Sequence, residues 1–267
     1  MQRTFDPDGL DEEPTVKLPH LFEFMDQPWL PDSLAATLRE ILSCGNAAPF
    51  RRYYSWVADK AVEIVRRHGS RHIVELGAGT APITRELVRN PAVGDATLIV
   101  CDARPDRATY EALQKQYPDK IAARLEPVDF SLPHQWPKDT LLILSGTFHH
   151  IPDKDRRKVL TALTDSADVV VIAEPLRKTL SSVAFVFLSI VPAILLPLWY
   201  IRRPGRLRRV FWCWLFPVAP IMFWWDGLVS CIRMWRNREW LDNLGAVAPP
   251  ERSPSVAHSL FCQMVAW

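Results

Sequence analysis

The chain has 267 residues, of which 48% are hydrophobic and 23% are charged, and its net charge is +2 at pH 7. This composition predicts one large globular domain, or one domain with an addition, and the small net charge argues against a general nucleic-acid-binding protein. Scattered cysteines without metal-ligand or disulfide spacing indicate buried free thiols in a reducing, cytoplasmic environment: Cys44, Cys101, Cys213, Cys231 and Cys262.

The first 70 residues predict a polar tail followed by a helical lid. Residues 1–18 are acidic and polar, which is typical of disorder, and they contain no apolar run of the kind found in signal peptides. Residues 19–70 contain two helical patterns, one beginning at Pro31 and one over residues 53–68. The first helix carries apolar residues at the helical period, namely Leu34, Leu38, Ile41 and Leu42.

Residues 72–80 predict a strand, a glycine loop and the start of a helix. The apolar run ends at Leu76, Gly77 and Gly79 permit a tight turn, and Pro82 suits the first turn of a helix. Such a loop lets the backbone approach a ligand, and the helix N-terminus favours a carboxylate. A dinucleotide-binding loop requires a third glycine where this chain has Pro82, which argues against a nicotinamide-dependent dehydrogenase.

Residues 71–176 predict a doubly wound α/β core with a parallel sheet. Apolar strands alternate with helical patterns that begin near Thr84, Asp106 and Lys154, with Asp153 expected as the N-cap of the last one. Several strands lack polar alternation, as expected for strands that are covered on both faces. The predicted strands are residues 72–76, 97–101, 121–128, 141–144 and 169–173, and residues 259–267 predict a further strand.

Two groups of residues in this core predict chemistry. Asp102 follows the second strand, where its carboxylate can accept hydrogen bonds from ribose hydroxyls; alternatively, it caps a helix. His149 and His150 follow the fourth strand, and a histidine suits proton removal near neutral pH. The alternatives are structural hydrogen bonds or a two-histidine metal site, but no third ligand lies nearby in sequence, so we expect no metal.

An apolar segment follows the fifth strand. Residues 181–201 and 210–225 lack charged side chains and flank a turn with five arginines, Arg202, Arg203, Arg206, Arg208 and Arg209. An apolar helix of this length can cross a bilayer core, but prolines interrupt both arms and a full crossing would place the arginines on the far side. We therefore expect shallow or re-entrant association of residues 181–225 with the inner face of a membrane, with a lid over a hydrophobic substrate as the alternative.

The pattern acidic-x-Gly-x-Gly at the end of a strand resembles the first motif of class I S-adenosylmethionine-dependent methyltransferases. This resemblance implies a seven-stranded, mostly parallel Rossmann-like sheet whose last two strands form an antiparallel hairpin. It also implies that Asp102 binds the ribose, that Asp129 binds the adenine amino group beside Phe130, and that the His149–His150 stretch faces the substrate. The cofactor-binding residues implied are Glu75, Gly77, Ala78, Gly79, Asp102, Ala103, Asp129, Phe130, Ser145 and Gly146.

Two outer segments resemble a bacterial subset of these methyltransferases. The first contains Glu23, Asp26 and Trp29, and the second contains Asp226 and Arg233, so that the resemblance runs from about Leu21 to Cys231. Asp226 and Arg233 lie two turns apart on one predicted helix that Asp226 opens, where they orient substrate or form a buried structural ion pair. We assign Asp226, with the two histidines, to catalysis, and the other four residues to substrate binding.

The sequence thus predicts S-adenosylmethionine-dependent methyl transfer to a small hydrophobic acceptor, a lipid or a specialised metabolite, with oxygen preferred as the acceptor atom. A catalytically silent scaffold that binds a membrane or a partner is the alternative. The predicted parts are a tail (1–18), a helical lid (19–70), the cofactor-binding core (71–176), an apolar helical hairpin (177–225) and a C-terminal helix with edge strands (226–267). The sixth strand could not be placed between Leu241 and Pro250.

Overall fold

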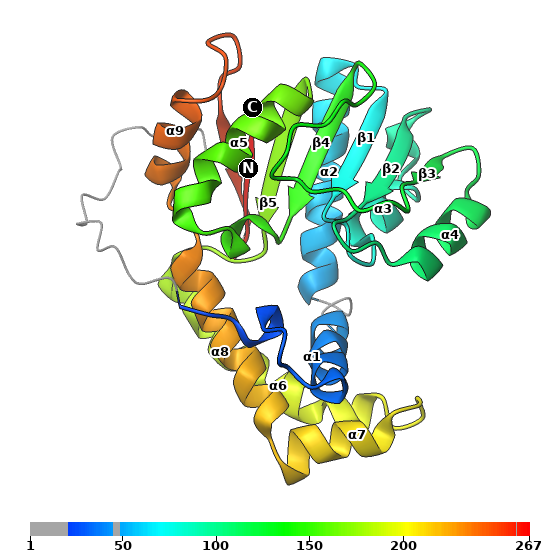
Figure 1. Cartoon of the computed structure of the whole chain (residues 1–267), viewed down its shortest axis with the longest axis vertical. Helices are drawn as coiled ribbons and strands as arrows, with labels where there is room; N and C mark the ends of the chain where they lie inside the picture. Colours follow the sequence, from blue (N-terminus) through cyan, green and yellow to red (C-terminus); the bar gives the residue numbers. More distant parts are fainter. Residues whose placement is uncertain (1–20, 45–48, 260) are drawn as a thin grey trace.

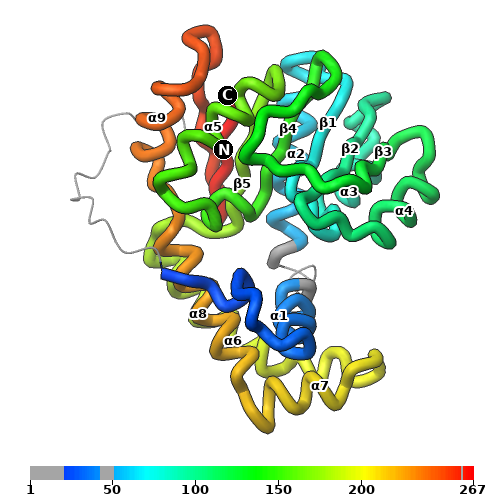
Figure 2. Tube along the Cα trace, viewed as in Figure 1, coloured from blue at the N-terminus to red at the C-terminus, as the bar shows by residue number. Residues whose placement is uncertain are grey.

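A seven-stranded sheet forms the centre of the protein, and the computed structural model describes residues 21–44, 49–259 and 261–267 (Figures 1 and 2). The strand order is β3-β2-β1-β4-β5-β7-β6, in which β7 is antiparallel to both of its neighbours and the other pairs are parallel. The strands are β1 (His72–Leu76), β2 (Thr97–Cys101), β3 (Ile121–Ala123), β4 (Thr140–Ser145), β5 (Val169–Glu174), β6 (Ser255–His258) and β7 (Gln263–Ala266). This confirms the predicted fold class, while the predicted tail of residues 1–18 lies outside the described residues.

Successive residues of the central strands enter two separate hydrophobic cores, because side chains alternate between the faces of a sheet. Ile73 of β1 joins one core and Val74 joins the other, and both are buried. The first core packs against α2 (Pro49–His68), α3 (Pro82–Leu87) and α4 (Arg107–Gln116), and the second packs against α5 (Asp153–Ser166) and α9 (Asn237–Gly245). Burial on both faces explains why these strands read as continuous apolar runs.

A group of helices lies beyond the carboxyl edge of the parallel strands (Figure 1). It consists of η1 (Phe24–Asp26), α1 (Asp32–Cys44), α6 (Leu180–Trp199), α7 (Arg206–Val210), the π-helical turn η4 (Phe211–Leu215) and α8 (Val218–Arg233). Its own apolar core joins Leu34 and Leu38 of α1 to Leu196 of α6 and Ala219 of α8. The first part of the predicted lid, η1 and α1, therefore forms one helical layer with the predicted hairpin, whereas α2, its second helix, packs against the sheet.

Three predictions about element boundaries were wrong. The third strand ends at Ala123 and not at residue 128, since Pro127 cannot donate a ladder hydrogen bond. Asp153 is the first residue of α5 and not its N-cap, because its carboxylate pairs with Arg156 at 2.9 Å. Asp226 lies within α8, which begins eight residues earlier, and a separate helix, α9, follows.

The two C-terminal strands complete the sheet as an antiparallel hairpin. The sixth strand is Ser255–His258, beyond the region searched in the sequence, and the seventh is shorter than predicted. Ser255 pairs with Ala266 and His258 pairs with Gln263, so the register places Val265 in the second core. An edge strand half exposed to solvent carries little apolar signal, which explains why the sequence did not reveal β6.

Candidate active site

The glycine loop after β1 adopts a conformation that requires glycine. Gly77 and Gly79 have φ values of +67° and +53°, which L-residues other than glycine rarely adopt. A Cβ atom on Gly77 would also lie 3.3 Å from Oγ1 of Thr147, in the loop after β4. The loop is therefore open on one side and pressed against the β4 loop on the other.

Glu75 closes the first turn of α3 instead of facing outward. Its two carboxylate oxygens accept hydrogen bonds from the backbone N–H groups of Ile83 (3.2 Å) and Thr84 (2.7 Å). Burial raises the pKa of Glu75 to about 7, against the lowering effect of these hydrogen bonds. The expected use of this helix end for a ligand carboxylate needs correction, because the side chain of Glu75 already occupies these two amides.

Asp102 joins the glycine loop to the end of β2. One carboxylate oxygen accepts the N–H of Gly79 at 2.9 Å, and the other accepts the N–H of Arg104 at 2.7 Å. The buried Ala78 donates its own N–H to the carbonyl of Cys101, so the two strand ends are linked twice. Asp102 therefore lies directly beside the glycine loop, with Ala103 exposed next to it, and ribose binding by Asp102 stays a prediction.

Asp129 and Phe130 reach the same edge of the sheet although β3 ends six residues before Asp129. The N–H of Val128 donates to the carbonyl of Asp102, which keeps this segment alongside the end of β2. Asp129 accepts the N–H of Ser131 at 2.8 Å, and this hydrogen bond lowers its pKa. The two residues line one side of a pocket of about 350 Å³.

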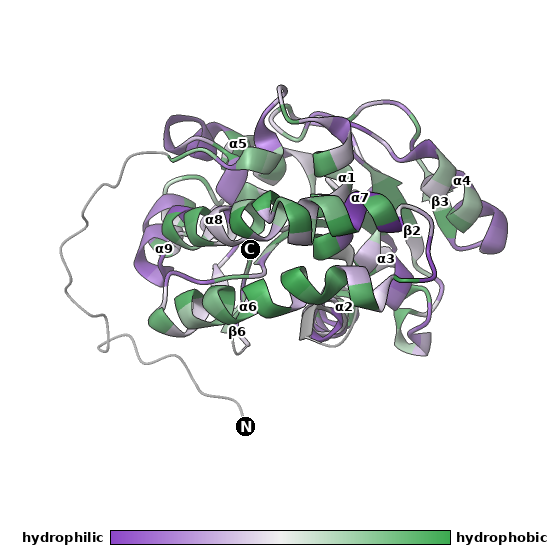
Figure 3. Ribbon diagram, turned by 90° about the horizontal axis from the view of Figure 1, so that it is seen from below, coloured by the Kyte–Doolittle hydropathy of each residue, from purple (hydrophilic) through white to green (hydrophobic). Residues whose placement is uncertain are grey.

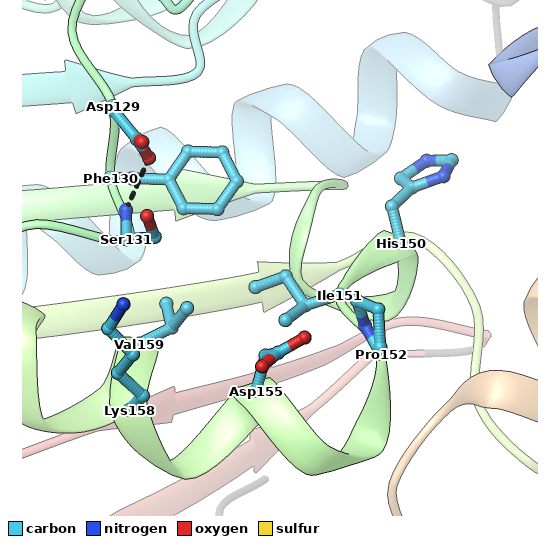
Figure 4. A pocket seen from close by; sticks show the side chains of 9 residues that line it. All are labelled: Asp129, Phe130, Ser131, His150, Ile151, Pro152, Asp155, Lys158 and Val159. Atoms are coloured by element: carbon cyan, nitrogen blue, oxygen red, sulfur yellow. Dashed lines mark hydrogen bonds between the residues drawn. The ribbon is translucent and has the colours of Figure 1, made fainter.

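Figure 4 shows this pocket between the Asp129 loop and the start of α5. The side chain of Phe130 projects across it, and the imidazole of His150 is turned away from Asp155 and Lys158 on α5. The pocket joins the predicted adenine side to the histidine side, while the glycine loop lies outside its lining. Of the other predicted cofactor residues, Ser145 bonds the hydroxyl of the buried Tyr53 at 2.6 Å, and Gly146 continues the β4 hydrogen bonds to β5.

The two adjacent histidines have different environments. His149 is buried, and its Nδ1 atom lies 2.7 Å from Oε2 of Glu174 at the end of β5. His150 is 34% exposed, and its Nδ1 atom lies 3.3 Å from Oε2 of Glu23 and 3.2 Å from Oδ2 of Asp26. One nitrogen of each ring is thus held by carboxylates, which leaves Nε2 of each ring for other partners.

Arg233 completes this cluster from α8. Its guanidinium lies 3.1 Å from Oε1 of Glu23 and 3.6 Å from Oδ2 of Asp26, and it also donates to the carbonyl of Leu21. Burial raises the pKa of Glu23 to about 7, while His150 and Arg233 lower it. The fold thus gathers three of the four predicted substrate residues around His150, whereas Trp29 is exposed and makes an edge contact with Phe24.

Asp226 holds the amino-terminal segment against α8. Its oxygens accept the backbone N–H groups of Phe24 at 2.7 Å and Met25 at 3.1 Å, and burial raises its pKa to about 6. The ion pairs of Arg233 in the described part of the chain are with Glu23 and Asp26, so the pair predicted between Asp226 and Arg233 does not form there. Asp226 positions Glu23 and Asp26, and its assignment to catalysis remains a prediction.

The fold brings a third potential metal ligand close to the two histidines, although none lies near them in the sequence. Glu23, His149 and His150 each offer one ligand atom, and these atoms all lie within 4.8 Å of one another. Two histidines and a carboxylate are a ligand set suited to Zn²⁺ or to other divalent transition metals. The guanidinium of Arg233, however, already faces Glu23, and a cation there would experience its repulsion.

Sequence reasoning did not assign two residues that organise the site. Glu174 orients His149, and its position at the end of β5, next to β4, was the available signal. Arg156 is buried and donates to the carbonyls of His149, Ile151 and Arg233, so it fixes the histidine turn against α8. No sequence pattern distinguished Arg156 from the charged residues around it in α5.

The strand order, the glycine loop and the acidic residue after β2 define the fold of the class I S-adenosylmethionine-dependent methyltransferases. Three solved structures that share it are similar at 11% sequence identity. The plantazolicin methyltransferase BpumL, in complex with SAH, has a TM-score of 0.54 over 88% of this chain and 93% of its own. The CurJ carbon methyltransferase has a TM-score of 0.51 over 88% of this chain and 60% of its own.

The third structure is an O-methyltransferase family 2 protein from Planctomyces limnophilus in complex with apigenin, with a TM-score of 0.51 over 90% of this chain and 62% of its own. The chain thus spans less than two thirds of the length of the CurJ and Planctomyces structures. No protein-family model matches the sequence, and no curated protein matches it significantly. At 11% identity these likenesses establish the fold, and the chemistry must be argued from the residues.

Proposed function

We propose that this protein transfers a methyl group from S-adenosylmethionine to a hydroxyl group of a small hydrophobic acceptor. The observation that carries the proposal is the meeting of two groups of residues at one edge of the sheet. The corner formed by Gly79 and Asp102 follows β1 and β2, and the histidine cluster follows β4 and β5. In a doubly wound sheet, ligands bind at this carboxyl edge.

The cofactor would supply a methyl group on a sulfonium sulfur, which leaves the protein to position the acceptor, exclude water and accept a proton. Gly77 and Gly79 allow close backbone approach, and Asp102 offers carboxylate oxygens beside them. The likeness to BpumL, which was solved with SAH, supports this cofactor through the shared fold.

His150 is the proposed base. Its exposed ring can take the proton of an acceptor hydroxyl at Nε2, because carboxylates of Glu23 and Asp26 hold Nδ1. The same carboxylates stabilise the imidazolium that forms, since an opposite charge within hydrogen-bond distance favours the charged form. His149, paired with Glu174 in the interior, positions the turn that carries His150.

A hydrophobic acceptor is proposed because the cluster lies against an apolar helical layer. Phe24 and Met25 follow Glu23 directly, and α8 leads from Asp226 toward a surface rich in exposed apolar side chains. Such a surface favours an apolar acceptor over a strongly charged one.

The experiment is to incubate the full chain with S-adenosylmethionine carrying an isotopically labelled methyl group and extracts of host cells, and to identify labelled products by mass spectrometry. A labelled hydrophobic product that is lost with His150→Ala supports the proposal. Binding of S-adenosylmethionine without any labelled product would favour the silent scaffold. Calorimetry that showed preferential NAD binding would overturn the cofactor assignment.

A further inference from the structure

The far end of the helical layer exposes a large apolar surface. α6 is 20 residues long and apolar enough to cross a bilayer by length and composition, and only 28% of its most apolar window is buried. Leu207 is 85% exposed, Leu215 is 66% exposed and Trp199 is 56% exposed. Other exposed apolar residues of this end are Ile194, Leu198, Ile201, Phe211, Trp214, Phe216 and Ile221.

These residues lie on helices that are side by side at one end of the molecule. Figure 3 views this end and shows mainly hydrophobic residues along α6 and α8, with hydrophilic residues at α7. The indole N–H of Trp214 donates to the carbonyl of Ile194 at 2.8 Å, which ties η4 to α6. The axis turns by 73° between the α7–η4 segment and α8, so one segment forms the end face and α8 leads back to the sheet.

Positive charge borders this apolar surface. Arg202, Arg203 and Arg206 are exposed in the turn between α6 and α7. Arg209 differs from them, since it is buried and donates to the carbonyls of Tyr200, Arg203 and Pro204. It therefore shapes the turn that presents the other arginines.

We propose that residues 194–221 form a monotopic anchor that enters the headgroup region of an anionic lipid bilayer, and that the methyl acceptor reaches His150 from that bilayer. Apolar side chains of the anchor enter the boundary of the acyl chains, the exposed arginines bind anionic headgroups, and Trp199 and Trp214 suit the interface between them. The proposal of an anchor depends only on the exposed apolar and charged side chains. The proposal that the acceptor comes from the bilayer depends in addition on the proposed methyl transfer.

The fold favours shallow insertion over a full crossing. α1 packs against α6, α7 and α8, and it carries Asp32, Arg39 and Glu40. Glu40 pairs with Arg208 at 2.7 Å and with Arg209 at 3.2 Å at the far end of the layer. If α6 crossed the hydrocarbon core, these charged groups would be drawn into it, which is costly for each of them.

The length of α8 sets the distance between the polar site and the proposed membrane surface. Asp226 lies eight residues after Val218, so at 1.5 Å per residue it lies about 12 Å from the start of the helix. Ser230 and Arg233, which contact Glu23 of the histidine cluster, lie about 18 Å and about 22 Å from it by the same measure. An interfacial segment enters a membrane by about 5–10 Å. The site would then lie on the aqueous side of the headgroups, where the polar end of an extended amphiphile can reach it while its apolar part remains close to the bilayer.

The test uses flotation of the full chain, without cofactor, on vesicles of phosphatidylcholine with or without phosphatidylglycerol, at low and high salt. We expect flotation with phosphatidylglycerol that weakens as salt screens the arginines. Changing Arg202, Arg203 and Arg206 together to Gln is expected to lower partitioning about 100-fold. The matched control changes Arg66, Arg67 and Lys115, which are exposed on α2 and α4, to Gln and is expected to float like the wild type.

Apolar burial is tested separately by the double variant Leu207→Asn with Leu215→Asn. The control is Leu132→Asn, at an exposed residue of the segment between β3 and β4. Loss of flotation in the double variant and not in the control supports the anchor. A wild-type protein that stays in solution at low salt, as a monomer or as a dimer that covers this face, overturns it. Protease enclosed in sealed vesicles that cuts the arginine turn would establish a crossing and overturn shallow insertion.

The acceptor is tested with labelled S-adenosylmethionine and vesicles made from host lipid. Label in an extracted lipid, lost in the arginine variant while its S-adenosylmethionine affinity is unchanged, supports delivery from the bilayer. Flotation with label only in water-soluble products would overturn delivery and leave both the anchor and methyl transfer standing. Flotation with no labelled product of any kind would instead count against the proposed function.

Discussion

The Nδ1 atom of His149 lies 2.7 Å from Oε2 of Glu174, and both side chains are almost completely buried. The neighbouring imidazole of His150 lies beside it, with ring centroids 4.1 Å apart and the two planes tilted by 36°, but remains partly exposed. Two identical residues in succession are therefore divided between a buried hydrogen bond to Glu174 and a partly exposed position. This division allows their roles to be tested one at a time.

Replacing His150 by Ala should lower turnover about 10²–10⁴-fold, because the acceptor hydroxyl loses its base, while cofactor affinity stays near the wild-type value. Turnover can be measured with labelled S-adenosylmethionine and affinity by calorimetry. His68→Ala removes an exposed histidine at the end of α2 and serves as the matched control. Wild-type turnover in His150→Ala would exclude this residue as the base.

Replacing Asp102 by Ala should weaken S-adenosylmethionine binding about 100-fold. The substitution removes the carboxylate expected to bind the ribose and also frees the N–H of Gly79, and hydrogen bonds to charged groups contribute about 1.5–3 kcal/mol each. Asp106→Ala is the control, because Asp106 is a nearby exposed carboxylate that caps α4. Equal affinities of the two variants, measured by calorimetry, would contradict the cofactor assignment.

Glu75 should make folding stability depend on pH. Burial raises the pKa of its carboxyl to about 7 in the folded chain, from an ordinary value of 4.5, so the folded state holds a proton that the unfolded state has released between these values. Rising pH therefore lowers the free energy of unfolding in this window. Relative to Glu75→Gln, the wild type should lose about 2 kcal/mol between pH 5 and 8. Urea denaturation gives this difference, and a difference independent of pH would be inconsistent with a buried neutral carboxyl.

Gly227 permits the close contact between α6 and α8. A Cβ atom on it would lie 2.9 Å from Cγ1 of Val186, so Gly227→Ala should destabilise the protein by about 1–3 kcal/mol through overpacking. Adding Val186→Ala should recover part of this loss, because it removes the opposing methyl groups. Gly245→Ala, at the end of α9 with open space around it, is the control. Strictly additive effects in denaturant unfolding would show that the two positions do not compete for space.

Metal removal should leave activity unchanged. The guanidinium of Arg233 lies 3.1 Å from Glu23 and supplies the positive charge that a cation would otherwise bring to the Glu23, His149 and His150 cluster. The measurement compares turnover before and after dialysis against a chelator, and after addition of Zn²⁺, Mn²⁺ or Mg²⁺. Activity that disappears on chelation and returns with one cation would identify the cluster as a metal site.

The strands and the glycine loop after β1 were largely predictable, because the sequence patterns that indicate them are local. The buried strand before Gly77, the turn and Pro82 lie within a few residues of one another, and β1 to β5 read directly as apolar runs. The third strand was misjudged because residues 124–128, although they follow β3 directly, do not pair as a strand. Even so, the hydrogen bond from Val128 brought Asp129 to the predicted edge.

For the cluster around His150, the sequence predicted which residues belong to it but not how they contact one another. Glu23 and His150 are separated by 127 positions, and no periodicity or spacing relates them. Their contact depends on the backbone of Phe24 and Met25 meeting Asp226, and on Arg156 holding the histidine turn against α8. The role of Arg209 was likewise hidden, since in sequence it is one of five similar arginines and only the fold makes it the buried one.

The hydrogen bonds from Phe24 and Met25 to Asp226 set an order of events during synthesis. About 200 residues separate the partners, and at about 5–20 residues per second the ribosome makes this stretch in about 10–40 seconds. The strands β1 to β5 are complete before α8 exists, so a nascent chain has its glycine loop in place while Glu23 still lacks Arg233. Under the proposed function, the segments that would hold the cofactor are therefore synthesised well before those that would bind the acceptor, and the apolar segment that precedes α8 is synthesised between them.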